Sequence, residues 1–307
     1  MSNVTLRQLR YFDALARHGH FGRAAEVCAV SQPALSVQIK ALEDTLGLTL
    51  VERGARSLRL TPFGHDCADR AAAILQSVDE LSDLARAAQD GLTGRLRIGI
   101  IPTIAPYLLP ALIGRVSRDH ASLDVHVRET ITPKLIHELH GGRLDAAILA
   151  LPVSEPGLTE IPLFDEAFVL VRPLPDANRP VPDRDALREM RLLLLEEGHC
   201  FRDQALSFCA LKTALPRDAL EGSSLATLVQ MVGAGIGVTL IPEMAVPVET
   251  RSAEVAIARF ADPQPRRHVG MVWRHSHPLA DRFHDLAQVV QDTAHHLRAQ
   301  HIAKTGA

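Results

Sequence analysis

Three amphipathic helices near the start of the chain constrain its fold more than any other feature. Apolar residues recur at intervals of three and four over residues 6–16, which predicts a helix that ends at Gly19. A short second helix is expected over residues 21–28. After a turn, Ser31 is placed to cap a third helix that tolerates Pro33 in its first turn. The order helix, helix, turn, helix predicts a helix-turn-helix motif.

The third helix divides into a buried and an exposed side. Leu35, Ile39, Leu42 and Leu46 have the spacing of one buried stripe. Gly47 ends this helix, and residues 48–60 are expected to form two short strands, a β-hairpin wing. The opposite face and the wing carry groups suited to DNA, with Ser31 at a helix N-terminus for phosphate. The candidate DNA contacts are Ser31, Gln32, Pro33, Ser36, Val37, Lys40, Arg53 and Arg56.

Each type of side chain in this set has its own use in a DNA groove. Gln32 can pair with adenine, Pro33 and Val37 can contact a thymine methyl, and Lys40 can reach phosphate or guanine. Any one of them alone is equally compatible with a solvated surface. The charge distribution favours DNA, because residues 1–65 carry a net +3 whereas the whole chain carries −3.

One long helix is expected over residues 62–91, with Thr61 as its cap. Its apolar and small residues alternate at spacings of four and three, which is typical of a coiled-coil seam and indicates a dimer. Packing of the helix on its own domain is the alternative, since alanine and cysteine suit that as well. The seam residues are Cys67, Ala71, Ile74, Val78, Leu81, Ala85 and Ala88.

Beyond a flexible joint at residues 91–94, apolar runs alternate with amphipathic helices. Strands are expected at residues 96–101, 123–127, 146–151, 168–171, 192–195, 238–241 and 269–273. Helices are expected after Pro106 and Pro133, over residues 202–211 and 225–232, and from Pro278. This alternation predicts an α/β fold with a parallel-rich sheet, in two lobes around a cleft, with chain crossings near Pro162 and Pro265. The expected domains are 1–60 (winged helix-turn-helix), 61–90 (linker dimerisation helix) and 91–307 (regulatory).

The four cysteines differ in their surroundings. The N-terminus lacks the layout of a signal peptide and no window is apolar enough for a membrane span, so we expect a soluble cytoplasmic protein with reduced thiols. Cys28 and Cys67 lie in helical seams, where packing is the simpler interpretation. Cys200 follows Gly198 at the expected start of a helix, with Arg202 two residues on. A helix N-terminus and a cation both favour the reactive thiolate.

The segment GHCFRDQALSFC, residues 198–209, places Cys209 nine positions after Cys200. If the intervening residues are helical, the two Cα atoms are roughly 13 Å apart, whereas a disulfide requires about 7 Å or less. Oxidation of Cys200 to a sulfenic acid and its capture by Cys209 would therefore force this segment to refold. The spacing by itself is weak evidence, and two unrelated cysteines are the default interpretation.

The run AAEVCAVSQPALSVQIKALEDTLGLTLVERGARSLRLTPFG, residues 24–64, resembles the winged helix-turn-helix of LysR-type transcriptional regulators, and the similarity in order and spacing covers the whole chain. The resemblance implies a DNA-binding domain and a linker-helix dimer. It also implies a two-lobed regulatory domain like periplasmic binding proteins, and a homotetramer.

Within that family, residues 198–209, IPTIAPYLLP (101–110) and PLFDE (162–166) resemble the hydrogen-peroxide sensors. The resemblance implies that Cys200 is the peroxidatic cysteine and Cys209 the resolving one, in a regulator that activates oxidative-stress genes, with RNA polymerase as a partner. The residues that match the peroxide-binding shell are Thr103, Thr132, His199, Arg202 and Asp203. Each threonine is also compatible with a helix cap.

One departure and three alternatives complete the sequence-based account. Ala226 stands where the peroxide sensors commonly have glutamate, which affects the expected coupling or tetramer interface. A LysR regulator with a small carboxylate effector near Thr103 and Ser224 is the first alternative, and a thiol peroxidase the second, which the DNA-reading domain disfavours. We expect no enzyme activity and no cofactor. A metal site, the third alternative, is not expected either, because Cys200 and Cys209 lack the close ligand pairs of zinc sites.

Overall fold

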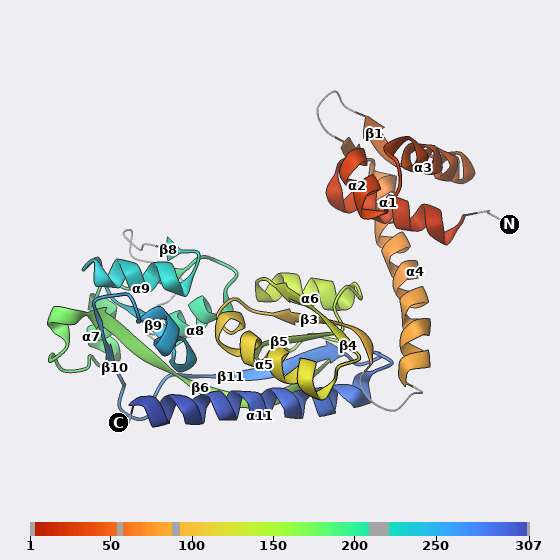
Figure 1. The fold of residues 1–307 in the computed structure, drawn as a ribbon. Helices are drawn as coiled ribbons and strands as arrows, with labels where there is room; N and C mark the ends of the chain where they lie inside the picture. Colours follow the sequence, from red (N-terminus) through yellow and green to blue (C-terminus); the bar gives the residue numbers. More distant parts are fainter. Residues whose placement is uncertain (1–3, 54–57, 88–92, 209–220, 306–307) are drawn as a thin grey trace. The chain divides into compact units, whose positions relative to one another are not determined.

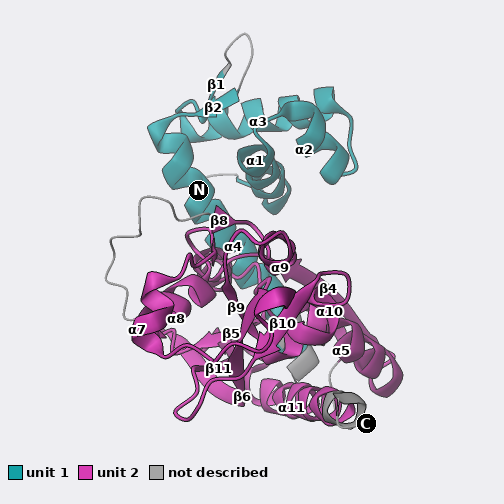
Figure 2. Ribbon diagram, turned by 90° about the vertical axis from the view of Figure 1, so that its left-hand side faces the viewer, with its two compact units in different colours: residues 1–85 teal, residues 86–307 magenta. Residues whose placement is uncertain are grey.

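The computed structural model describes residues 4–53, 58–87, 93–208 and 221–305. The chain divides into two compact units, residues 1–85 and 86–307 (Figure 2). The first unit consists of α1 (Leu6–His18), α2 (Phe21–Val27), α3 (Gln32–Leu46), β1 (Val51–Arg53), β2 (Leu58–Leu60) and α4 (Pro62–Ala87). The three helices and the β1–β2 hairpin agree with the winged helix-turn-helix expected from the sequence.

Caps set the limits of the first three helices. Thr5 and Gln8 form a capping box at the start of α1, and the Ser31 hydroxyl accepts a hydrogen bond from the Ala34 N–H at the start of α3. Gly19 and Gly47 end α1 and α3 in the left-handed conformation that glycine adopts without strain. The predicted stripe of α3 is buried with Phe12 and Leu15 of α1, except that Leu46 is only half-buried.

Helix α4 begins where expected, with the Thr61 hydroxyl accepting a hydrogen bond from the Gly64 N–H at 2.9 Å. Its predicted seam serves two purposes. Cys67 and Ala71 pack against the core of the first unit, which is the alternative that the sequence left open. Further along, Ile74 and Leu81 are 41% and 65% exposed. Such exposure in a single copy is expected of seam residues that would pack against a second copy. Ala88 lies outside the described residues.

The second unit is built on one seven-stranded sheet (Figure 1). Its strands are β3 (Gly94–Ile100), β4 (Leu123–Glu129), β5 (Ala146–Leu151), β6 (Leu158–Pro173), β9 (Thr239–Pro242), β10 (Val255–Ala258) and β11 (Arg266–Arg274). The order is β10-β6-β11-β5-β3-β4, with β9 also on β6. The expectation of a parallel-rich sheet is wrong: β11 lies between β5 and β6 and pairs antiparallel with both, and β9 and β10 pair antiparallel with β6. The parallel pairs among the described strands of this sheet are β3 with β4 and β3 with β5.

Helices cover both faces of this sheet, and α6 and α11 lie on opposite sides of it (Figure 1). The helices are α5 (Ala105–Asp119), α6 (Thr132–His140), α7 (Arg184–Glu189), α8 (Cys200–Phe208), α9 (Leu225–Gly233), α10 (Val246–Glu249) and α11 (Ala280–Thr305), with 3₁₀ turns η1 (Leu174–Asp176) and η2 (Glu243–Ala245). A small parallel pair, β7 (Leu194–Leu195) and β8 (Glu221–Gly222), lies apart. No helix among the described residues is both long and apolar enough to cross a membrane.

Two apolar cores confirm the two lobes of the second unit. One core is formed by residues of β3, β5, α5 and α11. The other is formed by residues of β7, β9 and α9 and by residues 168–171 of β6. The expected crossing at Pro162 is not a loop, because Pro162 lies inside the 16-residue strand β6. The register between β6 and β11 shifts beside Gly270, and an irregularity of this kind accommodates proline within a sheet. Strand β6 therefore carries the chain from one lobe to the other, and the chain returns between β10 and β11, at the expected Pro265.

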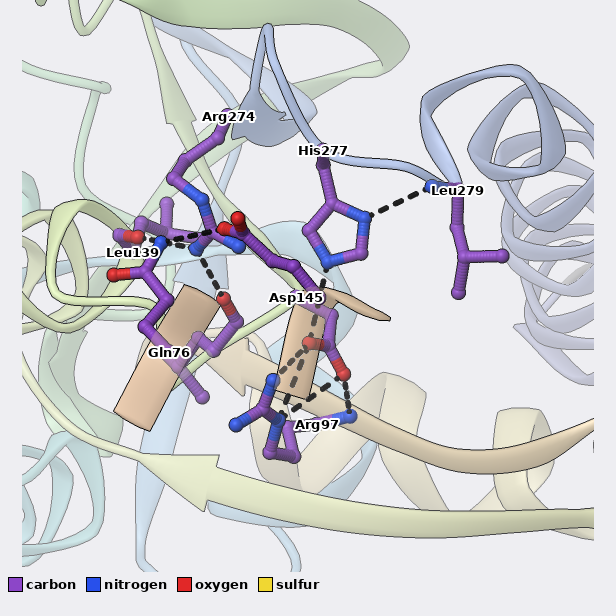
Figure 3. Close-up of polar contacts among 9 residues, drawn as sticks. Gln76, Arg97, Leu139, Asp145, Arg274, His277 and Leu279 are labelled. Atoms are coloured by element: carbon purple, nitrogen blue, oxygen red, sulfur yellow. Dashed lines mark hydrogen bonds and ion pairs between the residues drawn. The ribbon is translucent and has the colours of Figure 1, made fainter. Parts of the chain in front are cut away.

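A buried polar cluster fixes the first lobe (Figure 3). The Asp145 carboxylate accepts hydrogen bonds from the Arg97 N–H at 2.7 Å and from the Arg97 guanidinium at 2.6 Å. His277 accepts from the Leu279 N–H through Nδ1, which leaves Nε2 to donate to Asp145 at 3.4 Å. Burial by itself raises the pKa of Asp145, but the hydrogen bonds from His277 and Arg97 outweigh it and lower that pKa to about 2.

Candidate functional site

Cys200 is the first residue of α8, two residues earlier than the sequence placed the start of this helix. The preceding Gly198 has φ +92°, a left-handed value that other residues rarely adopt. A Cβ at Gly198 would lie 2.7 Å from Cδ1 of Ile131. Glycine therefore lets this turn approach the residue before α6, and the turn brings Cys200 beside the N-terminus of α6.

Four of the predicted peroxide-shell and redox residues meet in one narrow cleft. Thr103 comes from the loop between β3 and α5, Thr132 begins α6, and His199 and Cys200 come from the start of α8. Burial lowers the pKa of His199, with the Glu196 carboxylate opposing the change. A neutral imidazole beside the thiol can accept its proton. The residues that line the cleft are Ile101, Pro102, Thr103, Ile131, Thr132, His199, Cys200 and Phe201.

The two threonines differ in their hydrogen bonding. The Thr103 hydroxyl accepts from the Arg267 guanidinium at 2.8 Å, and the Thr103 carbonyl accepts from the same group at 3.0 Å. The Thr132 hydroxyl is buried and has no hydrogen-bond partner among the described residues. A buried hydroxyl without a partner carries a cost that a polar guest would remove. The cleft has no room for a water-sized molecule as it stands, so a guest requires its walls to move apart. Thr132 is thus the stronger candidate for direct contact with a small oxidant.

Arg202 and Asp203 do not line this cleft. The Arg202 guanidinium donates to the Leu195 carbonyl at 2.9 Å and to the Glu221 carboxylate at 2.6 Å. Asp203 is exposed to solvent. Two helical positions turn a side chain by about 200°, so Arg202 lies on the other side of α8 from Cys200. Arg202 instead anchors the start of α8 to β8.

Arg267 is the residue that the sequence analysis did not identify. It is fully buried and pairs with Glu166 of β6 at 2.7 Å while it holds Thr103. Its guanidinium also lies 6.0 Å from the ring centre of Phe201, next to Cys200. Glu166 lay inside the PLFDE motif, whereas Arg267 stood in a polar run before a strand and gave no signal.

A larger cavity of about 380 Å³ lies between the lobes beside this cleft. It shares Thr103 and His199 with the cleft and is lined also by Ser224 and Ala226. The Tyr107 hydroxyl donates to the Glu249 carboxylate at 2.7 Å and so joins α5 to α10 across it. This cavity is the geometric basis for the small-effector alternative. Ala226 adds no charge to its wall.

The predicted DNA face of α3 is open to solvent. Ser31, Gln32, Pro33, Val37 and Lys40 are exposed, and Ser36 is half-buried. Val37 is 63% exposed, so its side chain is accessible to a partner. The side chain of Arg53 and the whole of Arg56 lie outside the part of the chain that the structure describes.

The other described cysteines have the surroundings of packed thiols. Cys28 and Cys67 both contact the core of the first unit. Burial raises the pKa of each thiol, and the Asp13 carboxylate adds to the effect at Cys28. Both are therefore poor sources of thiolate at neutral pH. Cys209 lies outside the described residues, so its predicted role stays a prediction.

Comparisons with known proteins point to one family. Residues 6–65 match the bacterial regulatory helix-turn-helix protein of the lysR family, and residues 89–294 match the LysR substrate binding domain. A probable hydrogen peroxide-inducible genes activator of Streptomyces viridosporus is 46% identical over 292 residues, 94% of each chain. The DNA-binding transcriptional dual regulator OxyR of Escherichia coli K12 is 42% identical over 291 residues, 94% of this chain and 95% of its own.

Solved structures give the same result. Full-length OxyR from Pseudomonas aeruginosa with a cysteine-to-aspartate substitution is similar at a TM-score of 0.74 and 39% identity, over 95% of this chain and 96% of its own. A peroxide-bound Corynebacterium glutamicum OxyR with a cysteine-to-serine substitution matches at a TM-score of 0.68 and 38% identity, over 98% and 96% of the two chains.

Proposed function

The chain belongs to the LysR family of DNA-binding transcription regulators, and we propose that this member senses hydrogen peroxide through a reversible Cys200–Cys209 disulfide and so controls oxidative-stress genes. The observation that carries the proposal is the cleft in which Cys200 meets the partnerless Thr132 hydroxyl. The names of the relatives support the same oxidant.

The chemistry proceeds in two steps. The Cys200 thiolate attacks one peroxide oxygen, the S–O bond forms as the O–O bond breaks, and the departing hydroxide takes a proton to leave as water. Thr132 and Thr103 hold the peroxide, and His199 carries the proton. The Cys209 thiolate then attacks the sulfur of the Cys200 sulfenic acid, so that the S–S bond forms and hydroxide leaves, again as water.

Helix α8 converts this bond into a change of shape. Cys200 and Phe208 are its two ends, about 12 Å apart at 1.5 Å per residue, whereas disulfide-bonded Cα atoms lie within about 7 Å. Bond formation therefore requires α8 to unwind. Two of its own residues anchor it in the reduced form: Arg202 contacts Glu221 of β8, and Phe201 contacts Arg267. Unwinding breaks those contacts.

The wider assembly is proposed on the same basis. The protein acts in the cytoplasm as a homodimer through the α4 seam and as a homotetramer, binds double-stranded promoter DNA through α3 and the wing, and activates transcription with RNA polymerase. The functional domains are residues 1–60, 61–90 and 91–307. As a regulator it needs no catalytic turnover, which separates it from a thiol peroxidase.

A small effector in the cavity between the lobes is the second candidate function. The observation in its favour is the size of that cavity, about 380 Å³, with Thr103 and Ser224 in its wall. This second function predicts that DNA binding changes when an organic acid is added and does not change when peroxide is added.

The decisive comparison is the promoter footprint of the wild-type protein and Cys200→Ser, with and without one equivalent of peroxide. We expect peroxide to change the wild-type footprint and leave that of Cys200→Ser unchanged. Cys67→Ser is the matched control and should respond like the wild type. An unaltered wild-type footprint, or a responsive Cys200→Ser, favours the small effector.

A further inference from the structure

A second cavity of about 220 Å³ lies away from the peroxide cleft, where strand β6 passes between the lobes. It is lined by residues from the start of α5, the middle of β6, the η2–α10 turn and the C-terminal half of α11. Only Pro106 and Tyr107 line both this hinge cavity and the larger cavity between the lobes. The hinge cavity is therefore a separate site.

The body of the hinge cavity is apolar, and its volume suits about ten non-hydrogen atoms. Most of its exposed wall comes from carbon atoms, and Val248 is 53% exposed although it lies beside other apolar side chains. A concave apolar wall with a few polar groups is the usual form of a small-molecule site. The apolar wall consists of Pro106, Phe164, Met244, Pro247, Val248 and Leu297.

The polar rim favours an anion. Each carboxylate in the wall has a partner from outside the wall: Asp165 lies 2.6 Å from His268, Glu166 pairs with Arg267 at 2.7 Å, and Glu243 pairs with Arg259. Arg298 is different, because it is a cation that itself lines the cavity. It is exposed, donates to the Asp165 carbonyl at 3.2 Å, and lies 3.8 Å from the Glu243 carboxylate, which Arg259 already neutralises. Arg298 therefore has capacity for a second carboxylate.

The wall of the hinge cavity is connected to the redox cleft by direct contacts. Glu166 lines the cavity, accepts from the Met244 N–H at 2.8 Å and pairs with Arg267. Arg267 in turn holds Thr103, which lines the cleft of Cys200. A guest that displaces Glu166 thus acts on the position of Thr103 through two contacts, and one that displaces Met244 acts through three.

We propose that the hinge cavity binds a small aromatic carboxylate, and that its occupancy changes the rate at which Cys200 is oxidised. The aromatic body packs against the apolar wall and the carboxylate pairs with Arg298. The binding claim is independent of peroxide sensing, whereas the effect on rate rests on the proposed function.

Titration calorimetry on the full-length reduced protein tests binding with three matched probes: phenylacetate, 2-phenylethanol and phenethylamine. We expect phenylacetate to bind about three- to fivefold more tightly than the alcohol, since exposed ion pairs contribute modestly, and the amine to bind most weakly. Arg298→Gln should remove the preference for phenylacetate and leave the affinity for the alcohol within twofold. Arg118→Gln, an exposed arginine of α5 outside the cavity, is the control.

Val248→Trp fills the cavity from an exposed position and should weaken all three probes at least tenfold. Equal binding of the carboxylate and the amine, or binding that survives both Arg298→Gln and Val248→Trp, overturns the site. Rapid-mixing oxidation of Cys200 with saturating phenylacetate should differ at least twofold from the rate without it. An unchanged rate with binding intact overturns the coupling, and a Cys200 inert to peroxide refutes the proposed function while leaving the site in place.

Discussion

At the scale of single residues, the two threonines beside Cys200 give a matched pair. Thr132→Val removes a buried hydroxyl that has no described partner, so we expect the free energy of unfolding to be unchanged or slightly higher. Loss of one hydrogen bond to peroxide should slow Cys200 oxidation about tenfold. Rapid-mixing kinetics and urea unfolding measure the two effects.

Thr103→Val is the control for that substitution. It leaves the buried Arg267 guanidinium without one acceptor and should lower the free energy of unfolding by about 1–3 kcal/mol. If Thr132→Val is oxidised at the wild-type rate, the Thr132 hydroxyl has no part in holding peroxide.

Asp145 gives a prediction for pH. Its carboxyl has a pKa of about 2 in the folded protein and an ordinary value of 3.8, so its stabilising effect is complete above about pH 4 and is lost as the pH falls toward 2. That difference corresponds to about 2 kcal/mol. Asp145→Asn should therefore lower the free energy of unfolding by at least about 2 kcal/mol at pH 7, with the gap to wild type closing between pH 4 and 2.

Asp124→Asn is the comparison for Asp145, because Asp124 is 66% exposed and its ion pairs lie at the surface. Its effect should stay below about 1 kcal/mol at every pH. Urea unfolding between pH 7 and pH 2 measures both variants. Equal losses in the free energy of unfolding for Asp145→Asn and Asp124→Asn would contradict a stabilising role for the buried Asp145 cluster.

At the scale of elements, α3 is expected to lie in the DNA groove with Lys40 near phosphate. Lys40→Ala should weaken promoter binding and reduce the slope of log affinity against log salt by about 1. Lys134→Ala, an exposed lysine of α6 in the other unit, should leave the slope unchanged. Fluorescence anisotropy over a salt series measures both, and an unchanged slope for Lys40→Ala removes this side chain from the interface.

Elements with strong local signals could be predicted from the sequence. The stripe of α3, its Ser31 cap and its Gly47 stop are local features, and so is the apolar run of β5. The pairing of β6 with β11 depends on residues more than 90 positions apart, so periodicity gave no account of it. The short elements α7 and β10 have too few residues for a periodic pattern, and both were missed.

The same distinction holds within the candidate site. Cys200 was identified because a cysteine beside Gly198 at a helix start is a local pattern. Arg267 reaches Thr103 across 164 positions and Glu166 across 101, and only the folded sheet brings them together. Arg202 and Asp203 were placed in the shell by resemblance, and the direction of their side chains on α8 is what the sequence could not supply.

At the scale of the whole molecule, the proposed DNA-binding and peroxide-sensing residues lie in different units, residues 1–85 and 86–307. The basic excess lies in residues 1–65 and the acidic excess in the remainder. Cys28 and Cys67, the two thiols of the first unit, are packed and have raised pKa values. Under the proposed function, the redox signal enters through the second unit, where Cys200 lies.

Mass mapping of all four cysteines after a pulse of one equivalent of peroxide tests the central claim most directly. The account predicts an intramolecular bond between Cys200 and Cys209, with Cys28 and Cys67 still reduced, and Cys200→Ser should abolish the bond. A Cys200 that stays reduced while Cys28 or Cys67 is oxidised would contradict it.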